Sequence, residues 1–118
     1  MEVQFEDGIG FLIAKAAGTY SLDAMLRMFE RVAAEAHARG MRRVLLDVIQ
    51  VNGDVSDLDR YDMGRRAAEV FAHVERIGVI RNPQLRYTGF AFDVAQNRGL
   101  DARAFVERTD AERWLTGD

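Results

Sequence analysis

The spacing of apolar residues changes several times along the chain, and each change marks a predicted element. Residues 2–6 alternate, with Val3 and Phe5 on one side, which predicts a half-buried strand. The Asp7-Gly8 pair is typical of a type I′ hairpin turn, because both central positions of that turn need a positive φ. Residues 9–16 supply the apolar return strand. The chain is therefore expected to open with an antiparallel hairpin.

A helical period follows across residues 22–39, where apolar side chains recur every three or four residues. The members of this stripe are Leu22, Met25, Leu26, Phe29, Val32, Ala33 and Ala36. Ser21 is the expected N-cap, and Gly40 is expected to end the helix. We interpret the stripe as a core-facing surface and not as a partner-binding face, because most helices need packing to be stable.

The next strand is predicted over residues 44–49, which are apolar at consecutive positions. Continuous apolar character predicts a strand that is covered on both faces, as in a parallel sheet. Asp47 is the exception, because a carboxylate there needs hydrogen bonds or a partner charge. It is either a ligand-contacting acid at the sheet edge or an acid held by helix or loop amides, and we favour the second interpretation.

Helices and strands alternate through the rest of the chain. We predict a helix over 56–74, a strand over 77–80, a helix over 85–97, a strand over 102–106 and a last helix capped by Thr109 or Asp110. Gly64 falls on the apolar side of its helix, where glycine permits close approach of another backbone. The order β-β-α-β-α-β-α-β-α predicts one α/β domain over residues 1–118, with a mostly parallel central sheet and helices against it.

Several classes of chemistry lack their sequence patterns. The chain has no cysteine, and its two histidines, His37 and His73, stand outside any metal-ligand spacing. The acids from Asp54 to Asp59 lack the turn glycine and the distal glutamate of a calcium loop. The glycine patterns of P-loops and dinucleotide sites are also absent. We therefore expect no metal, no cofactor and, without a histidine or cysteine beside a nucleophile, no enzymatic activity.

Charge and hydropathy bear on partners and location. The net charge of −3 argues against nucleic-acid binding, and no apolar run approaches the roughly 20 residues of a membrane span. The acidic start MEVQFEDG does not resemble a signal peptide, so a cytoplasmic location is expected. Lys15 is the only lysine among many arginines, which is typical of a GC-rich bacterial genome.

The strand over 44–49, the break after it and the motif Asp54-x-Ser56-x-Leu58 resemble the core of STAS domains. These domains have the SpoIIAA-like fold of anti-sigma-factor antagonists. Later motifs are similar to a mostly uncharacterised subgroup of small bacterial STAS/Sec14-related proteins. These motifs are Ala95-x-Asn97-Arg98-Gly99, then Phe105, then Ala111-x-x-Trp114-Leu115. The resemblance implies a SpoIIAA-like sandwich and a regulatory role without catalysis.

In the antagonists the corresponding loop reads Asp-Ser-Ser-Gly-Leu, and a partner kinase phosphorylates the second serine. Asp54, Ser56 and Leu58 match that loop, whereas Val55 replaces the first serine and Asp57 replaces the glycine. A phosphate on Ser56 would gain from the helix N-terminus but would face repulsion from the neighbouring acids. Ser56 is therefore either a regulatory site or a plain helix N-cap, and we favour the N-cap.

Two functions follow from the resemblance. The first is a protein-interaction module that docks a kinase-like or other regulatory partner through Asp54, Ser56, Asp57 and Leu58. The second, by analogy with Sec14-like lipid-binding proteins, is a small apolar-ligand carrier. Its candidate pocket residues are Tyr61, Phe90, Phe92 and Trp114. The edge of the N-terminal hairpin also leaves homodimerisation open.

Overall fold

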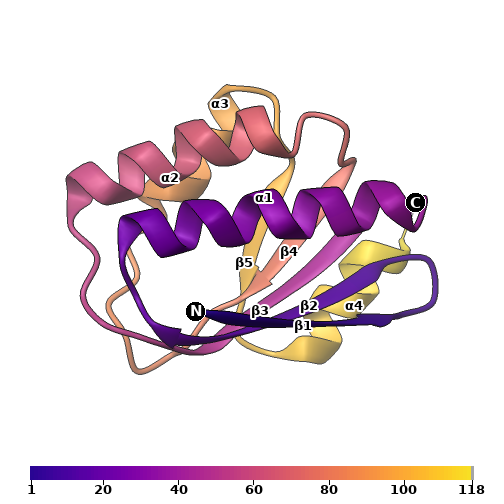
Figure 1. The fold of residues 1–118 in the computed structure, drawn as a ribbon, viewed down its shortest axis with the longest axis horizontal. Helices are drawn as coiled ribbons and strands as arrows, with labels where there is room; N and C mark the ends of the chain where they lie inside the picture. The colour runs from indigo at the N-terminus through magenta and orange to yellow at the C-terminus, as the bar shows by residue number, and fades with distance from the viewer. Residues whose placement is uncertain (118) are drawn as a thin grey trace.

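One sheet organises the chain, and the computed structural model describes residues 1–117 of it. The strands are β1 (Glu2–Asp7), β2 (Leu12–Thr19), β3 (Arg43–Asn52), β4 (Arg76–Ile80) and β5 (Ala102–Phe105). They lie in the order β1-β2-β3-β4-β5, with β1 antiparallel to β2 and all other neighbours parallel (Figure 1). The predicted hairpin and the mostly parallel sheet are both confirmed.

Helices cover both faces of this sheet. They are α1 (Leu22–Ala38), α2 (Asp57–Val70), α3 (Phe90–Asn97) and α4 (Arg108–Thr116). In Figure 1, α1, α2 and α3 lie on one side of the sheet, and α4 lies on the other. In β3, Val44 and Leu46 join the core beneath α1–α3, whereas Leu45 joins a smaller cluster beneath α4. The prediction that this strand is covered on both faces is therefore confirmed.

Helix α1 follows its predicted stripe closely. Ser21 caps it, because its Oγ accepts a hydrogen bond from the Ala24 amide at 3.1 Å. The buried side chains are Met25, Met28, Phe29, Val32, Ala33 and Ala36. Leu26 is partly buried against the same core. Met28 is also buried there, although it was not among the predicted members of the stripe. The helix is thus anchored by one continuous apolar face.

The hairpin turn differs from its prediction. Asp7 pairs with Leu12 in the sheet, so the connection spans residues 8–11 and is no two-residue type I′ turn. The positive φ of 85° occurs at Gly10, and the Gly8 amide donates to the Phe11 carbonyl at 2.9 Å. Phe11 is only 4% exposed and packs beneath α4. Its burial lengthens the connection, and the return strand begins at Leu12 instead of residue 9.

Two helix starts also differ. The third helix begins at Phe90 and not at residue 85, and Gly89 directly before it has a φ of 74°, outside the right-handed helical region. Asn82 Oδ1 accepts from the Gln84 amide at 3.0 Å, which stabilises a loop. The last helix begins at Arg108 after Glu107, so Thr109 and Asp110 lie inside it and do not cap it.

Asp47 is 8% exposed, and its carboxylate forms a hydrogen bond with the backbone of its own strand. Its Oδ1 accepts from the Ile49 amide at 3.0 Å, beside the register shift between β2 and β3. The carboxylate therefore gives the Ile49 amide a hydrogen-bond acceptor at the point where the pairing of β2 with β3 is irregular. This agrees with the backbone-held interpretation, although the partner amide belongs to the same strand and not to a helix or loop.

Candidate functional site

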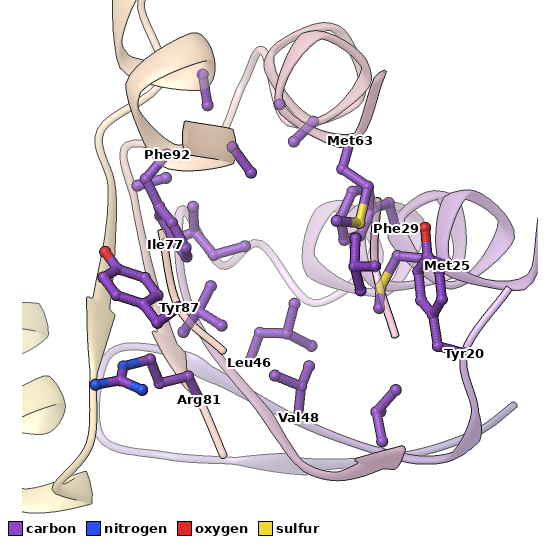
Figure 2. Close-up of a pocket in the computed structure, with 18 of the residues that line it drawn as sticks. Tyr20, Met25, Phe29, Leu46, Val48, Met63, Ile77, Arg81, Tyr87 and Phe92 are labelled. Carbon is purple, nitrogen blue, oxygen red and sulfur yellow. The ribbon is translucent and has the colours of Figure 1, made fainter. Parts of the chain in front are cut away.

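A largely apolar cavity of about 210 Å³ lies between the sheet and the helices α2 and α3. Its floor consists of side chains from β3 and β4, and its roof of side chains from α2 and α3. The floor is formed by Leu46, Val48, Val51, Ile77 and Val79. The roof is formed by Met63, Ala67, Ala91, Phe92 and Ala95. Figure 2 shows Met63 and Phe92 extending from the roof towards Leu46 and Val48.

The cavity exists because α2 packs closely on α3 without filling the space above the sheet. A Cβ atom on Gly64 would overlap the Ala91 carbonyl oxygen and would lie 2.8 Å from Val94 Cβ. The predicted close approach at Gly64 is therefore confirmed, and the partner backbone is that of α3. Gly64 is the only residue of α2 that is fully buried. The two helices form a lid whose underside remains partly unfilled.

The cavity opens beside the carboxyl ends of the parallel strands β3 and β4. Gly53 and Val55 follow β3 at this mouth, and residues 81–87 follow β4. This is the edge at which open α/β sheets place their ligands. The Arg81 guanidinium lies over the Tyr87 ring, 4.5 Å from its centroid, and Figure 2 shows the two side chains together at the cavity margin. Stacking of this kind orients the cation without neutralising it.

The charged residues that line the cavity are both cationic. They are Arg81 and Arg86, and no carboxylate lines the cavity among residues 1–117. Neither arginine has a carboxylate within ion-pair distance in that described part of the chain. Many other arginines of the protein do have one, including Arg43 with Glu75 at 2.8 Å. The mouth therefore carries net positive charge beside an apolar interior.

A hydrogen bond bounds the cavity next to Gly53, on the side away from Arg81 and Tyr87 (Figure 2). The Tyr20 hydroxyl donates to Asp59 Oδ2 at 2.9 Å and so ties the start of α1 to the start of α2. Burial of the hydroxyl and this hydrogen bond to Asp59 together raise the pKa of Tyr20 well above its usual value. Tyr20 thus stays protonated and remains a donor over the whole ordinary pH range.

The segment Asp54–Leu58 stands at the rim. Ser56 caps α2, because its exposed Oγ accepts from the Asp59 amide at 3.1 Å, and Asp57 pairs with Arg60 at 3.1 Å. Leu58 is 71% exposed and points away from the core. Asp54 lines a second hollow that adjoins the mouth and shares Arg86 with it. The N-cap role of Ser56 is therefore present in the structure.

The four aromatic residues predicted to form one pocket do not come together. Phe92 lines the cavity, and Phe90 lines the adjoining hollow. Tyr61 lies outside both, and its hydroxyl accepts from Arg98 at 3.1 Å. Trp114 packs against Phe105 on the opposite face of the sheet, with ring centroids 5.6 Å apart. An apolar helical stripe cannot tell which sheet face its helix covers, and this is why Trp114 was grouped with the others.

Arg81, Arg86 and Tyr87 line the cavity but were not among the site residues predicted from the sequence. They fall in the segment directly after β4, at the strand end where ligands bind in this class of fold. That signal was available, but a helix predicted from residue 85 placed two of the three on a helix instead of a loop. Among residues 1–117 there is no group of three or more metal-ligating side chains, and no helix there is long and apolar enough to span a bilayer.

Comparison with solved structures identifies the fold. A DUF3478-family protein from Shewanella loihica PV-4, described as uncharacterised with a SpoIIAA-like fold, superposes with a TM-score of 0.55. The two sequences are 20% identical, and the alignment covers 97% of this chain and 92% of the other. The chain thus has the SpoIIAA-like fold that its motifs predicted. No protein-family model matches the sequence, and no curated protein does so significantly.

Proposed function

We propose that this SpoIIAA-like domain is a non-enzymatic binding domain that holds a small apolar molecule between its sheet and the α2–α3 lid. The observation that carries this proposal is the apolar cavity of about 210 Å³. An engineered apolar cavity of about 150 Å³ already binds benzene, so the volume here suffices for a ligand. At about 30 Å³ for each water-sized group, it accommodates roughly seven non-hydrogen atoms.

The size of the cavity also sets the expected affinity. Transfer of about seven methylene groups from water, at about 0.8 kcal/mol each, supplies roughly 5–6 kcal/mol. This corresponds to a Kd on the order of 0.1 mM. The ligand is therefore a small molecule held reversibly, and whole phospholipids are too large for the cavity.

The test is an NMR titration of the ¹⁵N-labelled protein with octan-1-ol, an uncharged ligand of matching size. We expect saturable shifts that concentrate on residues lining the cavity. Ala67→Phe places a ring in the cavity from α2 and should abolish them. Ala34→Phe adds the same ring on the exposed side of α1 and should not. Non-saturable shifts, or equal shifts in the Ala67→Phe protein, would refute ligand binding in this cavity.

A second candidate function is docking of a regulatory protein at the rim. It is favoured by the 71% exposure of Leu58 beside the exposed hydroxyl of Ser56. The serine lies within one turn of this apolar side chain, and its phosphorylation would add charge that a partner can recognise. The experiment is incubation with candidate serine kinases followed by mass spectrometry of the modified peptide. If the kinases phosphorylate another residue, or if they phosphorylate Ser56 equally well in the Leu58→Asp protein, this segment is excluded as the docking site.

A further inference from the structure

We infer that the ligand of this cavity is an anionic amphiphile, with an apolar tail of about seven carbons inside and an acidic head group at Arg81 and Arg86. This inference rests on the proposed ligand binding and specifies the chemical class of the ligand. Its basis is the contrast between the lining of the cavity, which is largely apolar, and its charged residues, which are both cations.

The position of the two arginines fixes where the head group lies. Both belong to residues 81–87, which follow β4 and form one side of the mouth. The backbone of Arg81 is held in place, because its amide donates to the Phe105 carbonyl at 2.9 Å. Its side chain is half-buried and lies over Tyr87 at 4.5 Å. The guanidinium is thus positioned before a ligand arrives, which limits the entropy lost on binding.

Both arginines retain hydrogen-bonding capacity. Neither Arg81 nor Arg86 donates to a carboxylate among residues 1–117. A guanidinium group is well suited to bind a planar oxyanion through two parallel hydrogen bonds. Asp54 stands at the rim but lines only the adjoining hollow, together with Arg60 and Arg86. Arg60 is already paired with Asp57 at 3.1 Å. Within the lining of the cavity an anion therefore meets two cations and no carboxylate.

Tyr20 marks the other end of the ligand. Its hydroxyl is committed to Asp59 at 2.9 Å, so it offers no donor to a second polar group. Met25, Phe29 and Met63 complete this side with apolar surface, as Figure 2 shows. A second acidic group at this end would receive no hydrogen bond from Tyr20 and would lie near the Asp59 carboxylate. The site therefore fits a chain or ring with a single acidic end.

The experiment compares four ligands with straight alkyl tails of seven or eight carbons. They are octanoate, octyl phosphate, octan-1-ol and octyltrimethylammonium, each titrated by NMR at low ionic strength. We expect at least one of the two anions to bind about tenfold more tightly than the alcohol, and the cation to bind most weakly. The advantage should diminish with added salt. Octanoate and octyl phosphate distinguish a carboxylate from a phosphate head.

Matched variants locate the effect. Arg81→Gln with Arg86→Gln should remove the preference, so that both anions bind this variant no more tightly than octan-1-ol binds it. Saturable octan-1-ol shifts in the same variant show that the cavity is intact. Arg31→Gln with Arg42→Gln removes the same charge from exposed positions outside the cavity lining and should keep the preference. Arg81→Lys with Arg86→Lys should retain most of the preference for anions over octan-1-ol, because the positive charge remains.

The outcomes separate the two proposals. If octan-1-ol binds as tightly as both anions, or if the preference survives the double glutamine variant, the inference about the head group is wrong and the apolar site stands. If octyltrimethylammonium binds most tightly, the inference is likewise overturned. If none of the four ligands gives saturable shifts, the proposed function itself fails.

Discussion

Helices α1 and α2 lie next to each other over the same face of the sheet, yet they bury very different amounts of surface (Figure 1). Helix α1 buries six side chains over 17 residues, whereas α2 buries only Gly64 over 14. The side chains of α2 that face the sheet, Met63 and Ala67, remain partly exposed because the cavity lies beneath them. The first helix is thus part of the core, and the second covers a cavity.

Contacts at its sides hold α2 where core packing does not. Arg66 pairs with Glu30 of α1 at 2.9 Å, and Asp59 accepts from Tyr20 at 2.9 Å. Gly64 brings α2 against α3. Exposed ion pairs contribute little, typically about 0–1 kcal/mol each. An element held this way opens more readily than a core helix, and a ligand beneath it adds to its stability.

Truncation of one methionine on each helix tests the comparison most strongly. Met28→Ala removes a side chain that is 2% exposed and should cost about 2–5 kcal/mol, because it leaves a hole in a packed core. Met63→Ala enlarges a space that is already open and should cost about 1 kcal/mol or less. Urea unfolding of both variants measures the difference. Equal costs would mean that α2 is packed as tightly as α1.

Gly64→Ala tests the contact that replaces core packing for α2. In an unconstrained helix this change stabilises by roughly 0.5–1 kcal/mol. Here the new methyl group would press on the Ala91 carbonyl and on Val94, so we expect a loss of about 1–3 kcal/mol instead. The sign of the change in unfolding free energy is the readout. Stabilisation would show that α3 moves away at little cost.

The two helix caps can be compared directly. Ser56→Ala and Ser21→Ala each remove an N-cap hydrogen bond of 3.1 Å and should cost about 0.5–2 kcal/mol. Ser56→Asp keeps a capping oxygen and should restore most of the loss. Thermal unfolding followed by circular dichroism provides the measurement. If Ser56→Ala has no effect while Ser21→Ala does, the cap on α2 is structurally dispensable and a regulatory role gains weight.

Tyr20→Phe removes the hydrogen bond from α1 to α2 and should cost about 0.5–1.5 kcal/mol near neutral pH. The pKa of Tyr20 is raised in the folded protein, so its contribution is complete below pH 10, the value in the unfolded chain. Above pH 10 the unfolded chain ionises first, and the contribution declines as pH rises towards the folded pKa.

Chemical unfolding of wild type and Tyr20→Phe between pH 8 and about 11 should therefore show the gap narrowing above about pH 10. Tyr61→Phe serves as the matched control, because that hydroxyl is exposed and accepts from Arg98. A gap that stays constant with pH would contradict the assigned role of the Tyr20 hydroxyl.

Local residue patterns were sufficient for the order of the elements. The stripe on α1, the consecutive apolar residues of β3 and the cap at Ser56 each depend on neighbours within a few residues. Periodicity and capping are local physics, so they can be read along the chain. The SpoIIAA-like resemblance rested on the same local motifs, and the structural comparison bears out the fold.

The hairpin turn and the start of α3 could not be predicted in the same way. Phe11 lengthened the turn because the space beneath α4 buries it, and the left-handed backbone of Gly89 separates the loop after β4 from α3. In both places a tertiary contact or a specific loop interaction outweighed the local preference. Boundaries are decided by such competition and not by periodicity.

Residue spacing is enough to show which helices have an apolar face, but the direction in which each face points depends on how the helices pack on the sheet. Phe92 and Trp114 both follow helical spacing, yet the sheet separates them, and only Phe92 reaches the cavity. Arg81 and Arg86 show no pattern along the chain. They become a site because the end of β4 brings them to the mouth of an apolar space. A cavity is a space that several elements leave unfilled, and no single segment of sequence encodes it.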